Sequence, residues 1–539
     1  MNKNKLVILI AIIMLGFFLR VYKLSSLSMY GDELTLVGDS YSLLKTGKDQ
    51  LGETFPITFR MGAGRPAGYV YATIPFVALF GPTAIGVRAL SVLSGVLLIY
   101  LMYLFGKKLF NERVGLFTAF LASISPFGLN LSRGGFEANF ALLLTAWGTY
   151  LFLDYKKKPI NLLLTALLWG LAINTYPTYK VVLPLFLILL VLLTGGLKAV
   201  LKVNKKLLVC TALVVISIIC LTLGQTFFGI AETRFKNINM FSNLTIREQI
   251  VQNVNFDRTH SLLQGRAAEL FYNKPIEYLA LFIDNYLQNY STAYLFLTGD
   301  SNPRHNMTQS GILFWGEFIT LFYGLYLLSS KEKEVVRLLV GWLLLAAIAT
   351  AMVAEPQTLR NSFMLPPLLL VSAFGFVSFY HKFKLAGTFL FIVLVFQFAF
   401  LYHRQVYLSP VKQAHFWSYP AQIAAKFAYQ QRQDFDYVFI SDRINDVEYA
   451  YQVYNKIDPN QIIASNVSRI EVKGYMFKKI EGVHIGQIPK DVTEDFLKSL
   501  SGSALFIGDW DINDKYLTEI HKVNSPDGNT AFVYKNKTP

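Results

Sequence analysis

Residues 6–23 read LVILIAIIMLGFFLRVYK, and residues 24–34, which follow, read LSSLSMYGDEL. The first stretch is close to the roughly 20 apolar residues that cross the hydrocarbon core of a bilayer as a helix. A basic start, MNKNK, precedes it and no small-residue cleavage site follows it, so we expect a first span that is kept. A helix is the expected form because lipid offers the backbone no hydrogen-bond partners.

Similar apolar runs continue to about residue 404. Hydrophobic residues make up 53% of the chain and charged residues 16%, against roughly 25% charged in soluble domains. We therefore expect an α-helical polytopic membrane protein with about eleven spans, at about 6–23, 86–106, 114–131, 137–153, 160–175, 181–195, 207–229, 311–329, 335–353, 362–380 and 385–403. The apolar segment 67–81 is a candidate for a twelfth or re-entrant helix.

Basic residues gather in alternate short connections between these runs: Lys107, Lys108, Arg113, Lys156, Lys157, Lys158, Lys198, Lys202, Lys205, Lys206, Lys331, Lys333, Arg337, Lys382 and Lys384. The short connections on the other side carry one each, Arg133, Lys180 and Arg360. The positive-inside rule then predicts a cytoplasmic amino terminus in the plasma membrane. The net charge of +15 is explained by this pattern, and we expect no nucleic-acid partner.

From about residue 405 the composition becomes that of a soluble domain, which eleven spans would place outside the cytoplasm. The segments 437–441, 461–465 and 504–508 are apolar and bounded by polar turn residues, so they predict buried strands. We expect a membrane domain over 1–404, with long outer loops at about 24–85 and 230–310. A small extracytoplasmic α/β domain should follow over 405–539.

The candidates for chemistry are ionisable residues on the outer side of the spans. Asp32 and Glu33 lie side by side just beyond the first span, although a pair of acidic residues also suits the first turn of a helix. Separate cations around a carboxylate pair indicate a site for a phosphate-bearing amphiphile. The whole set maps to one side of the membrane: Asp32, Glu33, Arg65, Arg133, Glu137, Lys180, Arg304, His305 and Arg360.

In order and spacing, five segments resemble the GT-C glycosyltransferase superfamily, in particular bacterial transferases related to protein O-mannosyltransferases and to the aminoarabinose transferase of lipid A. The resemblance covers roughly 1–404. It rests on Asp32-Glu33, Arg65-Pro66-Ala-Gly-Tyr, Arg133 to Glu137, Gly299 to His305 and Pro356 to Pro367. Some relatives carry an acidic residue just before the basic-Pro segment, where this chain has Gly64, which argues against an acceptor or metal contact there.

The resemblance implies a GT-C fold and sugar transfer from a polyprenyl-phosphate-linked donor at the outer membrane face. Asp32 would be the catalytic carboxylate, with Glu33 as the alternative base, and Glu137 would lie on the acceptor side. Arg65 would be the leading donor-phosphate contact. The further contacts expected for that phosphate are Arg360, Arg304, His305, Arg133 and Lys180.

This chemistry suits one carboxylate among cations. A polyprenyl phosphate leaves as a stable anion, so no general acid is needed, unlike in glycoside hydrolysis with its paired carboxylates. One base deprotonates the incoming hydroxyl, cations stabilise the departing phosphate, and direct displacement inverts the anomeric carbon. The acceptor stays open between a lipid, a protein and a cell-wall glycan.

The sequence predicts no required cofactor. It contains no HExxH, no CxxC pair and no EF-hand loop, so a divalent metal is conceivable but unsupported. Asp509-Trp-Asp511 spells a DxD motif, which we interpret as a surface turn. The alternative function is a transporter or flippase of lipid-linked glycans, which would carry mid-membrane charges and internal symmetry. A third possibility, a scaffold that binds glycan, leaves the outer cations unexplained.

Overall fold

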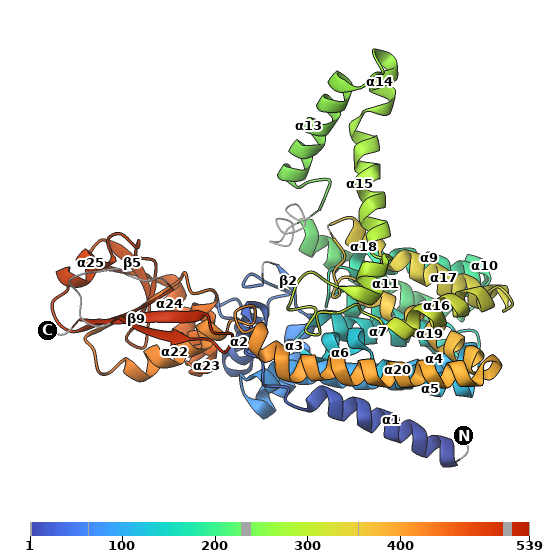
Figure 1. Ribbon diagram of the computed structural model, residues 1–539, viewed down its shortest axis with the longest axis horizontal. Coiled ribbons are helices and arrows are strands. Elements are labelled where there is room, and N and C mark those ends of the chain that lie inside the picture. The colour runs from blue at the N-terminus through green and yellow to red at the C-terminus, as the bar shows by residue number, and fades with distance from the viewer. Residues whose placement is uncertain (1–2, 63, 228–238, 354, 510–519, 538–539) are drawn as a thin grey trace. The chain divides into compact units, whose positions relative to one another are not determined.

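The computed structural model describes residues 3–62, 64–227, 239–353, 355–509 and 520–537 (Figure 1). The chain forms two compact units. The first, which we call the bundle unit, holds residues 1–22, 63–68 and 91–402. The second, the sheet unit, holds residues 23–62, 69–90 and 403–539.

The bundle unit is helical, and each of the eleven predicted runs is helical over most of its described length. Its elements are α1 (Lys3–Val21), β2 (Arg65–Pro66), most of α4 (Ala84–Leu109), α5 (Glu112–Ile124), α6 (Pro126–Arg133), α7 (Glu137–Phe152), α8 (Ile160–Ile173), α9 (Tyr179–Leu193), α10 (Gly196–Leu201), α11 (Lys205–Phe227), α13 (Leu244–His260), α14 (Arg266–Phe271), α15 (Lys274–Gln288), η1 (Ala293–Leu297), α16 (Trp315–Leu328), α17 (Lys333–Ala346), α18 (Ile348–Ala351), η2 (Ser362–Met364), α19 (Leu365–Lys382) and α20 (Lys384–His403).

The predicted number of eleven spans is not confirmed. Among the described residues, six helices are long and apolar enough to cross a membrane, and a bent pair, α5 with α6, raises the number to seven. The predicted spans at α7, α8, α9 and α16 form helices of 16, 14, 15 and 14 residues. These are shorter than the roughly 20 residues that cross hydrocarbon at 1.5 Å per residue.

The predicted span 114–131 is broken. Helices α5 and α6 meet at an angle of 52°, because Pro126 has no N–H with which to continue the helix and Ser125 caps α6 instead. Arg20 of α1, 1% exposed, donates to the carbonyls of Ala122 and Ser123, each at 3.0 Å. The side chain of one span therefore binds backbone groups beside the break in another.

Helices α16 and α19 cross closely at a pair of glycines. A Cβ on Gly375 would lie 1.8 Å from the carbonyl oxygen of Thr320, and one on Gly324 would lie 2.3 Å from that of Val371. The Thr320 and Ser372 hydroxyls are 3.1 Å apart at the same crossing. Small residues and hydroxyls of this kind are what membrane helices use to pack without a hydrophobic driving force.

The sheet unit contains α2 (Gly31–Thr46), β1 (Thr58–Phe59), α3 (Gly68–Phe80), η3 (Arg404–Leu408), α21 (Ser409–Lys412), α22 (Tyr419–Gln431), β3 (Tyr437–Ser441), α23 (Val447–Tyr454), α24 (Pro459–Val467), β4 (Ile470–Val472), β5 (Tyr475–Ile480), β6 (Val483–Gly486), α25 (Thr493–Ser499), β7 (Ala504–Gly508), β8 (Ile520–Asn524) and β9 (Thr530–Lys537). Its sheet has the order β4-β5-β6-β3-β7-β9-β8. Strand β3 pairs in parallel with β6 and β7. The predicted α/β domain is thus confirmed.

Two of the three predicted strands are correct, since β3 and β7 span 437–441 and 504–508. The prediction for 461–465 is wrong, because these residues lie in α24. Asp458 caps that helix by accepting from the Asn460 N–H at 2.9 Å, and Pro459 is pre-set for the first turn. A short apolar run does not by itself distinguish a strand from a buried helix.

Candidate active site

Asp32 and Glu33 lie in the first turn of α2, as expected, but their surroundings differ. Asp32 is exposed, whereas Glu33 is completely buried. Because successive residues of a helix point about 100° apart, one carboxylate can face solvent while its neighbour is enclosed. The structure therefore separates two side chains that the sequence left equivalent.

Glu33 forms a buried ion pair with Arg88 of α4, which is also 0% exposed. Arg88 Nε lies 2.7 Å from one carboxylate oxygen and Nη2 lies 2.6 Å from the other. The remaining guanidinium donors bind the carbonyls of Leu24, Leu27 and Ser28 at 2.7–3.0 Å. A fork-to-fork pair of this kind fixes geometry and neutralises the Glu33 charge, so Glu33 anchors the loop before α2.

The same loop is held by residues from the carboxy-terminal part of the sheet unit. The N–H of Met29 donates to the Tyr454 hydroxyl at 2.8 Å, and the N–H of Gly31 donates to Asp446 at 3.1 Å. A Cβ on Gly31 would lie 2.3 Å from an Asp446 carboxylate oxygen, so a larger residue there would displace the Asp446 side chain. Burial raises the pKa of Tyr454, which keeps its hydroxyl neutral. The backbone immediately before Asp32 is therefore fixed at several points.

In the bundle unit, the structure brings Arg65 and Glu137 together. Arg65 Nε lies 2.8 Å from Glu137 Oε1, and the two side chains are only 4% and 14% exposed. Glu137 is the first residue of α7, where a carboxylate is favoured by the helix dipole. Glu137 thus orients the guanidinium of Arg65, which the sequence analysis proposes as a contact of the donor phosphate.

Arg133 is 4% exposed and points at the end of α1. Its Nη1 donates to the carbonyls of Leu19, Arg20 and Tyr22 at 2.8–3.2 Å. A cation at the carbonyl end of a helix stabilises it. These contacts give Arg133 a structural task that competes with the predicted contact to a phosphate.

His305 lies in a loop that Asp300 organises. The Asp300 carboxylate accepts from the Thr358 N–H at 2.6 Å and lies 3.3 Å from His305 Nδ1. The His305 ring meets the edge of Phe136, with centroids 5.9 Å apart, and Phe136 directly precedes Glu137. His305 is therefore close to the segment that holds Arg65.

The segments that carry Arg360 and Lys180 also meet. The hydroxyls of Tyr179 and Ser362, neighbours of these cations in sequence, are 3.0 Å apart, and Lys180 donates to Gln225 at 3.3 Å. Thr358, bound by Asp300, is two residues before Arg360, and Arg304 directly precedes His305. Contacts in one unit thus join the segments of Arg65, Glu137, Arg304, His305, Arg360 and Lys180, while Asp32 and Glu33 belong to the other unit.

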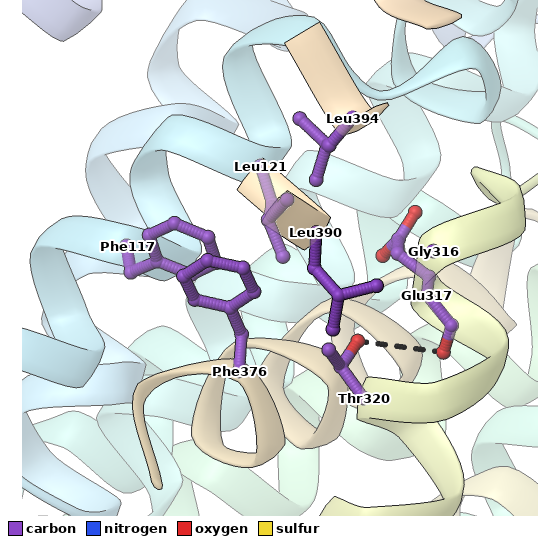
Figure 2. Close-up of a pocket in the computed structure, with 8 residues that line it drawn as sticks. All are labelled: Phe117, Leu121, Gly316, Glu317, Thr320, Phe376, Leu390 and Leu394. Carbon is purple, nitrogen blue, oxygen red and sulfur yellow. Dashed lines mark hydrogen bonds between the residues drawn. The ribbon is translucent and has the colours of Figure 1, made fainter. Parts of the chain in front are cut away.

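A narrow cavity in the bundle unit is lined by none of the predicted site residues. Figure 2 shows Glu317 and Thr320 among apolar side chains of α5, α19 and α20. Glu317 is 1% exposed, and one of its carboxylate oxygens accepts from the Phe314 N–H at 2.9 Å. That contact caps the start of α16, which is the usual use of a glutamate at this helix position.

Three residues of the candidate site escaped prediction: Arg88, Asp300 and Asp446. A signal existed for Arg88, because an arginine inside an otherwise apolar run has to find a buried partner. Asp300 and Asp446 carried no such signal, because acidic residues in polar loops are common. Asp509 of the DxD motif lies 3.6 Å from Arg443, whereas Asp511 lies outside the described residues.

Comparison with known proteins places this geometry in a family context. Residues 65–221 match the family model described as dolichyl-phosphate-mannose-protein mannosyltransferase. A crystal structure of ArnT from Cupriavidus metallidurans matches with a TM-score of 0.53 and 14% identity, over 99% of this chain and 98% of ArnT. The chain has the GT-C fold.

A second GT-C structure is similar as well. AglB, the archaeal oligosaccharyltransferase from Archaeoglobus fulgidus, matches with a TM-score of 0.50 and 13% identity, over 94% of this chain and 69% of AglB. No curated protein sequence matches the chain. The predicted GT-C fold is therefore confirmed. The long apolar helices among the described residues support a multi-pass membrane protein, and the family model that matches residues 65–221 is that of a glycosyltransferase.

Proposed function

We propose that this GT-C protein transfers a sugar, a hexose or a pentose, from a polyprenyl-phosphate-linked donor to an acceptor hydroxyl or similar group at the outer face of the plasma membrane. The observation that carries the proposal is the pairing of Glu33 with Arg88, which leaves Asp32 as the exposed carboxylate of the pair. The matched ArnT structure is bound to undecaprenyl phosphate, and the matched AglB structure holds dolichol-phosphate and an inhibitory peptide.

In this proposal Asp32 is the general base. It takes the proton of the acceptor hydroxyl as that oxygen attacks the anomeric carbon, and the bond to the phosphate oxygen breaks on the opposite side. A positioned base of this kind contributes about 10²- to 10⁴-fold. Glu33 is a positioning residue, because its charge is already neutralised by Arg88.

Arg65 is the proposed principal contact of the donor phosphate. A guanidinium offers two parallel hydrogen bonds to phosphate oxygens, and the pair with Glu137 at 2.8 Å holds it in place. Glu137 then acts through Arg65 as well as bordering the acceptor. Arg304, Arg360 and Lys180 supply further positive charge and His305 a further hydrogen-bonding group, and Arg133 has a smaller role because its guanidinium binds the end of α1.

We further propose that residues 1–404 form the transferase region, with a cytoplasmic amino terminus, and that residues 405–539 lie outside. The contacts from Tyr454 and Asp446 to the loop before Asp32 support a task for the carboxy-terminal domain, namely to position that loop. The acceptor is a lipid, a protein or a cell-wall glycan.

The test uses a deletion strain complemented with single variants, and it measures lipid-linked sugars and surface glycans by mass spectrometry. Asp32→Asn should abolish transfer while the donor accumulates, because an amide keeps the shape but cannot take a proton. Asp284→Asn, an exposed change in α15, is the matched control and should behave as the parent. Normal transfer by a correctly inserted Asp32→Asn variant would remove Asp32 from this role, and loss in a folded Glu33→Gln variant alone would exchange the two roles.

A further inference from the structure

Helices α13, α14 and α15 form an arm that stands away from the rest of the bundle unit (Figure 1). Helix α15 carries a row of exposed apolar side chains, Ile276, Leu279, Ile283 and Leu287, which are 41%, 56%, 46% and 60% exposed. Spacings of three and four residues place them on one side of the helix. An apolar stripe of this length in contact with water is unfavourable, so it needs an explanation.

The direction of α15 suggests what covers the stripe. In Figure 1, α15 runs across the direction of α19 and α20, which belong to helical segments long and apolar enough to cross a membrane. A helix that runs across the spans lies along the plane of the bilayer. Amphipathic helices in that orientation rest at the boundary between headgroups and acyl chains, with the apolar side inserted.

The base of the helix shows which way the stripe faces. The hydroxyl of Tyr286 donates to the Leu344 carbonyl at 2.7 Å, and that of Tyr290 donates to the Leu343 carbonyl at 2.5 Å. Both acceptors lie in α17, a candidate membrane span. Leu279, Ile283 and Tyr286 succeed one another at spacings of four and three, so the apolar side of α15 continues the side that contacts a span.

The opposite side of α15 meets the end of the same span. Asn285 is buried and its amide donates to the carbonyl of Ala351, the last residue of the candidate span Lys333–Ala351. Tyrosines are also enriched at membrane interfaces, where the ring meets acyl chains and the hydroxyl finds a polar partner. Both sides of the helix near its end therefore contact the candidate span, and the exposed stripe continues the side of Tyr286 and Tyr290.

The charges of the arm indicate how it would bind. Residues 243–288 contain four basic residues, Arg247, Arg258, Arg266 and Lys274, against five acidic ones, Glu248, Asp257, Glu269, Glu277 and Asp284. The arm therefore lacks the basic excess that draws helices to anionic lipid.

Further apolar side chains near the tip of the arm are also exposed: Leu262, Leu270 and Phe271 are 102%, 68% and 58% exposed.

We propose that α15 is an interfacial helix whose Ile276, Leu279, Ile283 and Leu287 insert into the outer leaflet, with no requirement for anionic lipid. The occupant of the stripe is the lipid surface itself. An acceptor protein or a second copy of this chain would leave the stripe away from lipid.

The experiment places an environment-sensitive fluorophore on single cysteines of the full chain in phosphatidylcholine nanodiscs. Cys210 and Cys220, both exposed, are first replaced by serine. The labelled variants are Leu279→Cys and Ile283→Cys on the stripe, with Glu277→Cys, half-buried on the polar side, as the matched control. Quenching is measured with a lipid that carries a nitroxide near the headgroup end of its acyl chain, and with aqueous iodide.

The stripe labels should lose emission with the nitroxide lipid and resist iodide, whereas the Glu277→Cys label should do the reverse. Addition of anionic lipid should change neither pattern. Equal access of iodide to all three labels overturns the proposal. Protection from iodide without quenching by the nitroxide lipid also overturns it, because a protein surface would then cover the stripe, and a requirement for anionic lipid overturns the proposed apolar mode of binding.

Discussion

Replacing Arg88 by methionine tests whether a buried ion pair fixes the candidate catalytic loop. Both Arg88 and Glu33 are 0% exposed, and removing one partner of such a pair typically costs about 3–5 kcal/mol because it strands a buried charge. Arg88→Met also removes the donors of three carbonyls, those of Leu24, Leu27 and Ser28. Each buried carbonyl left without a partner costs a further ~1–3 kcal/mol.

The decisive comparison is with the double variant Arg88→Met, Glu33→Met. It loses the same three carbonyl contacts but leaves no unpaired charge, so it should be less damaged than Arg88→Met alone by about 3 kcal/mol. Stability is measured by denaturation in detergent, and local order by hydrogen exchange of peptides from the start of α2. If the double variant is as unstable as Arg88→Met, or if Arg88→Met costs nothing, the ion pair does not hold this loop.

Three further outcomes follow from the structure. Arg65→Lys should lower use of a polyprenyl-phosphate sugar about 10-fold and Arg65→Gln up to about 150-fold, which corresponds to about 1.5–3 kcal/mol for a charge-assisted contact. Turnover is measured in detergent at matched protein amounts. If both variants keep the kinetics of the parent protein, the donor phosphate binds elsewhere. Burial lowers the pKa of His484 to about 4, below the roughly 6.5 of an unfolded chain. The unfolded state then binds more protons between these values, so stability is complete above about pH 6.5 and falls towards pH 4, by on the order of 3 kcal/mol. His484→Gln should flatten this dependence in denaturation of the full chain, and an unchanged acid limb would exclude His484 as its cause. A topology reporter fused after Lys535 should be active only outside the cytoplasm, and activity only inside would overturn the proposed orientation.

Much of the fold could be predicted because hydropathy and backbone hydrogen bonding act locally. The apolar runs became helices, and the strands at 437–441 and 504–508 were found at their observed limits. The break at Pro126 was missed, since an apolar run with one proline resembles a continuous span until a neighbour such as Arg20 binds the carbonyls beside it. The error at 461–465 arose because capping by Asp458 outweighed strand propensity.

The sequence proposes candidate site residues by residue type and by their expected side of the membrane, but it does not predict their pairings. Sequence order cannot show that Arg88 neutralises Glu33 or that Glu137 orients Arg65. These pairs join residues far apart in the chain, and a salt bridge depends on geometry that local pattern does not encode. The pairings nevertheless change the proposed assignment, in which Glu33 and Glu137 act as positioning residues.

The guanidinium of Arg20 has a consequence for biogenesis. Its partners Ala122, Ser123 and Ser132 are synthesised more than 100 residues later, at sequence separations of 102, 103 and 112. During translation the first helix must therefore enter the bilayer before these partners exist, with the Gly16 carbonyl of the same helix as an acceptor for Arg20, a state eased by extension of the side chain towards headgroups. Once α5 and α6 have been synthesised, their carbonyl and hydroxyl groups can bind Arg20 and hold the first helix against them. The order of synthesis is then part of how this protein assembles.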